Sequence, residues 1–155
     1  MSSQYDVLVI GSGPAGESAA LNAVKHGQHV AIVEQQNWVG GACTHQGTIP
    51  SKALRHTVRQ LMRFNRNPIF RDLGDPRTLS FPRVLGAADE VIRKQVAMRS
   101  KFYQRNRIEV IQGQARFDDP HTLVISKDGR ERRVSAENIV IATGSRPYRP
   151  ANIDF

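Results

Sequence analysis

Val7-Leu8-Val9-Ile10-Gly11-Ser12-Gly13-Pro14-Ala15-Gly16 is the stretch of the sequence that decides the fold. Its four aliphatic residues run without a polar interruption, which predicts a short buried strand from Tyr5 to Ile10. Residues 17–26 then read as a helix, with a packing stripe of Ala19, Ala20, Ala23 and Val24. Gly27 stands where a left-handed helix cap belongs, and residues 29–34 predict a second strand. Together these segments form a strand–helix–strand unit.

The glycine spacing inside this unit predicts a dinucleotide-binding loop. Gly11 would make the tight turn, Gly13 would let the backbone approach a pyrophosphate, and Gly16 would let helix and strand pack closely. The helix N-terminus attracts an anion, and Glu34 ends the second strand where it can accept hydrogen bonds from ribose hydroxyls. A purely structural glycine turn is the alternative, but strand, helix, second strand and terminal acid all agree with binding. The candidate cofactor-binding residues here are Gly11, Gly13, Pro14, Ala15, Gly16, Glu34 and Gln35.

The middle of the chain predicts two helices separated by irregular segments. Residues 35–48 form a glycine-rich loop, and Pro50 suits the first turn of a helix expected over residues 51–63. Residues 65–80 read as irregular, and a long helix follows over residues 82–105. The residues of this helix at helical spacing are Leu85, Ala88, Ile92, Val96, Arg99 and Phe102, among which Arg99 interrupts the apolar pattern.

After residue 107 the pattern changes to that of strands. Short strands are predicted at residues 108–111, 115–117, 122–126 and 131–134, joined into a small antiparallel meander. Residues 138–142 predict a last buried strand, parallel to the first two. The sequence therefore indicates an α/β fold: a Rossmann-like domain with a parallel sheet, flanking helices and a small antiparallel β-meander.

Composition narrows the class of protein. The 155 residues carry a formal net charge of +8, and the single cysteine excludes an internal disulfide framework. The N-terminus holds no basic segment, and the first apolar run is too short for a signal peptide or a membrane span. We therefore expect a cytoplasmic protein with no membrane partner. The arginines are scattered, which favours a solvated basic face over a nucleic-acid partner, and no metal site is predicted.

A second segment carries a resemblance to a known family. Gly40-Gly41-Ala42-Cys43-Thr44-His45-Gln46-Gly47-Thr48-Ile49-Pro50-Ser51-Lys52 resembles the active-site segment of the flavin-dependent pyridine nucleotide–disulfide oxidoreductases. In that family two cysteines precede Ile-Pro-Ser-Lys; here Cys43 is present and Thr48 takes the second position. This combination of Cys43 and Thr48 before Ile-Pro-Ser-Lys is similar to the sequence of the family's soluble pyridine nucleotide transhydrogenases. Ile111–Phe117 resembles the family's adenine-contacting Gly-x-Ala-x-Phe segment, and Ala142-Thr143-Gly144 resembles its second FAD motif.

The resemblance implies that FAD is the dinucleotide, and it assigns further residues to the cofactor. Lys52 matches a lysine near flavin N5, where a cation stabilises negative charge on reduced flavin. Lys52, Cys43 and Thr48 are thus the candidate catalytic positions. We expect Cys43 to be a small buried residue without a redox role, and His45 to be a packed neutral histidine. The cofactor-binding residues added by the resemblance are Gly40, Gly41, Ala42, Cys43, Lys52, Gln114, Ala115, Ala142, Thr143 and Gly144.

The missing second sulfur decides the activity that the resemblance implies. Thr48 breaks the relay from flavin to disulfide, so a second nicotinamide becomes the electron acceptor. The implied reaction is NADPH + NAD⁺ ⇌ NADP⁺ + NADH through FAD. A divergent disulfide reductase resembling dihydrolipoamide dehydrogenase is one alternative, and a catalytically inactive nucleotide-binding fragment is another. A nucleic-acid binder is the most distant alternative.

The resemblance also predicts the domain organisation. Residues 1–150 are expected to be an incomplete, N-terminal FAD-binding domain, and residues 151–155 the start of a linker to an absent nicotinamide-binding domain. Family members are several times longer, bind nicotinamide dinucleotides in that second domain, and add a dimerisation domain. We therefore expect a homo-oligomer at full length, and we expect the 155-residue chain alone neither to hold FAD tightly nor to turn over substrate.

Overall fold

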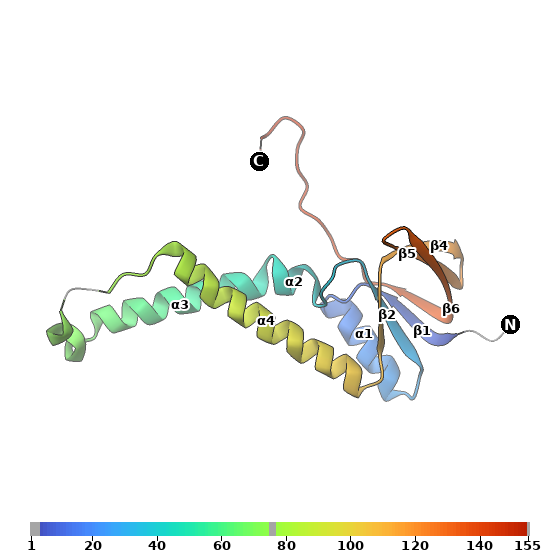
Figure 1. Cartoon of the computed structure of the whole chain (residues 1–155), viewed down its shortest axis with the longest axis horizontal. Coiled ribbons are helices and arrows are strands. Elements are labelled where there is room, and N and C mark those ends of the chain that lie inside the picture. The colour runs from blue at the N-terminus through green and yellow to red at the C-terminus, as the bar shows by residue number, and fades with distance from the viewer. Residues whose placement is uncertain (1–3, 75–76, 155) are drawn as a thin grey trace.

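The centre of the molecule is a mixed sheet of six strands, seen in a computed structural model (Figure 1). The structure describes residues 4–74 and 77–154, apart from the side chains of residues 71–73. Strands β3, β2, β1 and β6 are paired in parallel, and β6, β5 and β4 are antiparallel. The bounds are β1 Tyr5–Ile10, β2 Val30–Glu34, β3 Glu109–Gln112, β4 Gln114–Asp119, β5 Thr122–Lys127 and β6 Arg130–Ile141. The parallel sheet and the antiparallel meander are both confirmed.

Strand β6 joins the two parts of the sheet. Its first half pairs with β5, and its second half, from Ala136 onward, pairs in parallel with β1. The sequence analysis predicts two separate strands here, at residues 131–134 and 138–142, which is wrong. The intervening residues Ser135-Ala136-Glu137 include neither glycine nor proline, so nothing in them ends the strand.

The carboxyl half of β6 is also less buried than predicted. Ile139 and Val140 are half-buried, but the side chain of Ile141 is 66% exposed. Among the described residues this half of β6 pairs with β1 alone, whereas its first half pairs with β5. The expectation of a buried last strand over residues 138–142 is therefore wrong.

Strand β3 belongs to the parallel sheet. The sequence analysis assigns it to the meander, which is wrong. It pairs with β2, with Val110 opposite Ile32. Gly113 then turns the chain into β4 with a φ of 149°, and a Cβ there would lie 2.6 Å from the Ile125 side chain. A glycine at this crossing is required because the two parts of the sheet meet backbone against side chain.

Each face of the sheet has its own apolar core. On one face Val9, Ile32 and Ala20 pack with Tyr103 of the last helix, while Leu8 lies in the opposite core beneath the meander. All five residues of β2 are buried, as expected for a strand with both faces covered. The parallel strands thus have helices on one face and the meander on the other.

The helices begin earlier and number more than predicted. Helix α1 spans Pro14–Lys25, so it starts at the proline of the glycine loop, and Gly27 adopts the expected left-handed conformation with a φ of 79°. Residues predicted as loop contain a short helix α2, Gly41–His45, and α3 already begins at Thr48 and runs to Arg66. Gly40 and Gly47 are the residues immediately before these two starts, so glycines that suggested a loop in fact precede helices.

Helices α3 and α4 form a long antiparallel pair that extends well beyond the sheet (Figure 1). A 3₁₀ turn η1, Pro68–Leu73, lies between them, and α4 spans Phe81–Arg105. The prediction of an irregular segment over residues 65–80 is thus wrong for η1, and residues 75–76 lie outside the described part. Within the predicted stripe of α4, Ala88 is buried, but Leu85 and Phe102 are 38% and 39% exposed. Tyr103 takes the buried position instead.

Among residues 4–74 and 77–154, no helix is long and apolar enough to cross a bilayer. Within the same ranges no group of His, Cys, Asp and Glu could hold a metal ion.

Candidate functional site

Gly11 and Gly16 close the turn that follows β1. The N–H of Gly11 donates to the carbonyl of Val33 at 2.8 Å, which holds the turn between the ends of β1 and β2. A Cβ at Gly11 would lie 2.4 Å from the carbonyl oxygen of Ala142, and one at Gly16 would lie 1.9 Å from that of Gly11. Only glycine fits either position, as the predicted loop requires.

The start of α1 leaves backbone donors free for an anion. Gly13 precedes the helix without a capping side chain, and the first bond across it runs from Glu17 N–H to Gly13 carbonyl at 2.8 Å. The N–H groups of Ala15 and Gly16 precede that bond, so they point toward the N-terminal end of the helix. The nearest atom to a Cβ at Gly13 would be 4.0 Å away, so the glycine leaves open space above the loop. This arrangement fits a phosphate group.

Glu34 lies at the end of β2 and is only 6% exposed. Its Oε2 accepts hydrogen bonds from the backbone N–H of Ser12, at 3.0 Å, and from the Ser12 hydroxyl. Its Oε1 accepts from Gln36 N–H at 2.9 Å. A carboxylate oxygen has two acceptor positions, so Oε1 keeps one for a ribose hydroxyl.

Ser12 is a residue of the site that the sequence analysis missed. Its hydroxyl accepts from Gly40 N–H at 3.0 Å while it donates to Glu34, so it links the phosphate loop to the second glycine segment. Ser12 is fully buried, and no sequence signal beyond its place between two motif glycines could have indicated this role.

Gly40 and Gly41 bring the second segment against the first. Both have a positive φ, and a Cβ at Gly41 would lie 2.8 Å from the Cα of Gly13. A Cβ at Gly40 would lie 2.5 Å from the Thr44 hydroxyl oxygen. The two glycine segments therefore meet backbone to backbone at the carboxyl edge of the sheet, where ligands bind in open α/β folds.

Thr44 stands out in this segment because it is fully buried and its hydroxyl has no hydrogen-bond partner within the described part of the chain. Its neighbour Cys43 is half-buried and Ala42 is exposed. His45 donates a hydrogen bond from Nε2 to the Val39 carbonyl at 2.9 Å, and its ring lies 5.7 Å from that of Trp38.

The candidate redox positions lie on two different helices. Cys43 is in α2, whereas Thr48 is the first residue of α3. Lys52 lies near the start of α3 and is exposed. Pro50 lies in the first turn of α3, as predicted.

The remaining candidates reach the same edge from other strands. Ala142 follows β6 and its N–H donates to the Ile10 carbonyl at 2.9 Å, which places the exposed Thr143 and Gly144 next to the phosphate loop. Gly113 N–H donates to the backbone carbonyl of Glu34 at 2.9 Å. The next two residues, Gln114 and Ala115, therefore start β4 close to the end of β2. Gln35, the residue that follows β2, is exposed.

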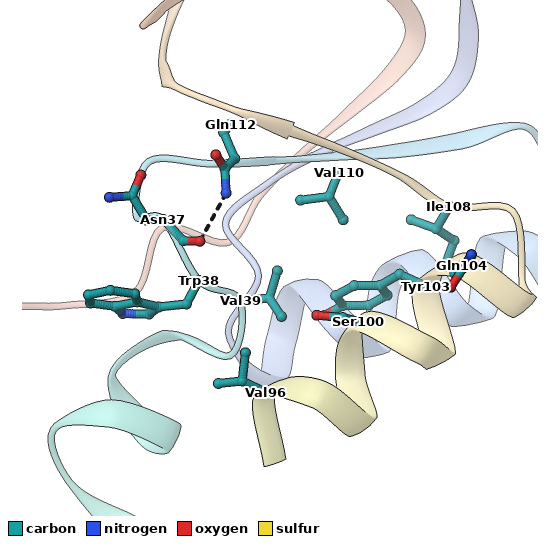
Figure 2. Close-up of a pocket in the computed structure, with 10 residues that line it drawn as sticks. All are labelled: Asn37, Trp38, Val39, Val96, Ser100, Tyr103, Gln104, Ile108, Val110 and Gln112. Carbon is teal, nitrogen blue, oxygen red and sulfur yellow. Dashed lines mark hydrogen bonds between the residues drawn. The ribbon is translucent and has the colours of Figure 1, made fainter. Parts of the chain in front are cut away.

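A pocket of about 400 Å³ lies along the flank of this edge, between the loop after β2, β3 and α4 (Figure 2). Gln112 donates from Nε2 to the Asn37 carbonyl at 2.9 Å across its upper side. Its lining includes none of the predicted cofactor residues, so it adjoins the phosphate loop without containing it. The lining residues are Asn37, Trp38, Val39, Val96, Ser100, Tyr103, Gln104, Ile108, Val110 and Gln112.

Comparison with known proteins decides the family. The profile described as pyridine nucleotide-disulphide oxidoreductase matches residues 5–154. The chain belongs to this family.

Relatives within the pyridine nucleotide-disulphide oxidoreductases share most of this sequence. A soluble pyridine nucleotide transhydrogenase of Chromohalobacter salexigens is 63% identical over 153 residues, covering 97% of the chain and 33% of the relative. One of Pseudomonas putida is 59% identical over 152 residues with the same coverage. The chain thus spans about a third of the length of the curated relatives it matches.

Solved structures of a flavoprotein disulfide reductase share the fold. The HOCl-induced flavoprotein disulfide reductase RclA from Escherichia coli superposes with a TM-score of 0.77 at 30% identity, over 95% of this chain and 30% of that one. A Cu(II) complex of an RclA variant gives a TM-score of 0.79 at 28% identity, over 97% and 31% of the two chains.

Proposed function

We propose that this chain is the FAD-binding portion of a soluble flavoprotein transhydrogenase, which interconverts NADPH + NAD⁺ and NADP⁺ + NADH. The observation that carries the proposal is Thr48 at the position where disulfide reductases of the family hold their second cysteine, beside a complete set of dinucleotide-binding glycines. The names of relatives that are 63% and 59% identical to the chain support the same reaction.

The glycine loops fit the diphosphate of FAD. The open space above Gly13 and the exposed donors at the start of α1 favour an anion there. Glu34 would bind the adenosine ribose through the free position on Oε1. Gln114 and Ala115 would face the adenine, and Ala142, Thr143 and Gly144 would lie on the opposite side of the loop.

The flavin end of the site would be formed by α2 and α3. Bound FAD supplies the hydride chemistry that carries two electrons between nicotinamides. Lys52 would place a cation beside the flavin, and Thr48 would fill the position of the absent sulfur. Cys43 lies in a helix of its own and has no second cysteine in the sequence to pair with.

A disulfide reductase is the competing function, because the superposed RclA structures carry that name. Its exchange chemistry needs two sulfurs, and the sequence contains one cysteine. The relatives named transhydrogenase are also about twice as identical to the chain as RclA is.

Electron uptake distinguishes the two functions. We would titrate the flavin-loaded protein of natural length with NADPH under anaerobic conditions and then add an NAD⁺ analogue. A transhydrogenase without a disulfide accepts about two electrons per flavin and passes them to the analogue, whereas a flavin plus a disulfide accepts about four. Uptake of four electrons, or no reduction of the analogue, would reject the proposal.

Further expectations concern the protein at its natural length. We propose that it binds both nicotinamide dinucleotides in a domain beyond residues 151–155, that it forms a homo-oligomer, and that it acts in the cytoplasm without a nucleic-acid or membrane partner. Residues 1–150 would then be the FAD-binding unit.

A further inference from the structure

A second carboxylate lies in the first turn of α1, the helix whose start is proposed to bind the diphosphate. Glu17 is in the first turn of the helix, and its N–H donates to the Gly13 carbonyl at 2.8 Å. Four residues of helix span about 6 Å, and helical side chains lean toward the N-terminus. The backbone of Glu17 therefore lies about one helical turn from the N–H groups proposed to bind phosphate.

This position is unfavourable for binding a phosphate unless the charge is offset. Glu34 already places one buried carboxylate at the same edge of the sheet. The side chain of Glu17 is 26% exposed, so water screens its charge only in part. Two carboxylates around a turn that holds a diphosphate would repel the ligand.

Tyr103 hydrogen-bonds Glu17 but cannot offset the charge. Its hydroxyl donates to Glu17 Oε2 at 3.4 Å, and its side chain is 1% exposed. Burial raises the pKa of Tyr103, and the charges of Glu17 and Glu34 raise it further. Tyr103 stays a neutral donor.

Arg99 of α4 is the cation that meets Glu17. Its Nε lies 2.9 Å from Glu17 Oε2, and its side chain is 14% exposed. A terminal nitrogen of the same guanidinium donates to Gln95 Oε1 at 2.8 Å, so the group is held from its own helix as well. This arrangement explains why Arg99 interrupts the apolar spacing of α4: it points to α1 and not into the core.

We propose that Arg99 is a positioning residue for the dinucleotide, which neutralises Glu17 and thereby keeps the start of α1 attractive to the diphosphate. The inference rests on the proposed function, because it assumes that FAD occupies the glycine loops. It adds a residue from a helix far along the chain to the electrostatics of the site.

The test measures FAD affinity for the apoprotein of natural length by titration calorimetry. Arg99→Gln leaves Glu17 uncompensated, so we expect the dissociation constant to rise about tenfold at low salt, with a smaller rise at about 1 M salt. The double variant Arg99→Gln with Glu17→Gln removes both charges and should return to within about threefold of the parent. A purely structural ion pair would make the double variant as weak as the single one.

Thermal unfolding of the same variants separates affinity from stability. Arg99→Gln leaves the largely buried Glu17 carboxylate unpaired, so its melting temperature should fall further than that of the double variant. Both variants should stay folded at the temperature of the titration, so a difference in their affinities is not due to unfolding. Arg132→Gln is the matched control. Arg132 forms an ion pair of 3.1 Å with Glu109, and this pair lies away from the glycine loops, so the variant should leave FAD affinity unchanged.

The outcomes are distinct. An unchanged affinity in Arg99→Gln, or a double variant that stays weak, overturns the inference while FAD binding by the parent persists. A parent protein that binds no FAD overturns the proposed function, and the inference with it.

Discussion

At the scale of single residues, Glu34 both organises the site and is proposed to bind the ribose. Glu34→Gln replaces an acceptor by an amide whose N–H₂ would face the Ser12 donors or the Gln36 N–H. We expect FAD affinity to fall about 10- to 100-fold and stability to fall by about 1–3 kcal/mol, because hydrogen bonds to a charged group are lost. Calorimetric titration and urea unfolding check both effects. The exposed Glu137→Gln serves as control, and an unchanged affinity would reject the ribose role.

Thr44 offers a second test at this scale. Its buried hydroxyl lacks a partner among the described residues, and such a group costs stability that an isosteric methyl does not. Thr44→Val should therefore raise the stability of the FAD-free protein by about 1 kcal/mol. Equilibrium unfolding in urea measures it. A loss of stability would show that an ordered water or a ligand satisfies the hydroxyl.

The predictability of these residues differs for a physical reason. Glu34 and the glycines could be found from sequence, because each is fixed by its place at the end of a strand or in a tight turn. Ser12 and Arg99 could not be, because their roles depend on partners 28 and 82 residues away along the chain. Long-range contacts of this kind leave no local signature.

At the scale of elements, helix α3 carries positive charges that repel one another. The helix carries five cations and no acidic residue, and Arg55, Arg59 and Arg63 recur every fourth position on one exposed face. Like charges at this spacing destabilise a helix by a few tenths of a kcal/mol per pair.

Arg59→Glu should therefore stabilise the protein. It replaces two repulsions, with Arg55 and with Arg63, by two attractions, so we expect a gain of about 1 kcal/mol at low salt that disappears at about 1 M salt. Arg59→Gln should give about half the gain. Urea unfolding at both salt concentrations measures the change. A loss of stability would mean that Arg59 has an acidic partner in the protein of natural length.

Sequence periodicity predicts which elements exist better than how they join. It predicted helices close to α1, α3 and α4 and strand segments within each observed strand, because local patterns determine them. It divided β6 in two and assigned β3 to the meander, because strand pairing depends on partners distant in sequence. It also missed α2, whose five residues are too few to show a helical period.

At the scale of the whole molecule, the two ends of the parallel sheet differ in character. The carboxyl end carries the glycine loops, as expected for a ligand edge. Away from those loops, the Tyr5 hydroxyl donates to Glu109, and Arg132 pairs with the same carboxylate at 3.1 Å. This network joins β1, β3 and β6, strands that are distant in sequence, so it supports the sheet on which the binding loops stand.

The network predicts how stability depends on pH. Burial and the hydrogen bond to Glu109 raise the pKa of Tyr5 from 10.0 to about 12, so its contribution is complete below pH 10 and is lost as the pH rises through about 12. The hydrogen bond from Tyr5 lowers the pKa of Glu109 from its usual 4.5, so that contribution is present above pH 4.5 and is lost as the pH falls through the lower value. Stability should therefore decline at both extremes.

Tyr5→Phe isolates the alkaline part of this profile. Without the hydroxyl, the decline between pH 10 and about 12 should become shallower by about 1 kcal/mol. The acid decline below pH 4.5 should become smaller, because Glu109 loses its donor and its folded-state pKa returns toward the usual value. Urea unfolding across the pH range measures both limbs. Tyr148→Phe, at an 86% exposed tyrosine, should change neither. An alkaline decline that is the same in Tyr5→Phe as in the parent would place the titrating group elsewhere, with buried Tyr103 the next candidate because its pKa is also raised.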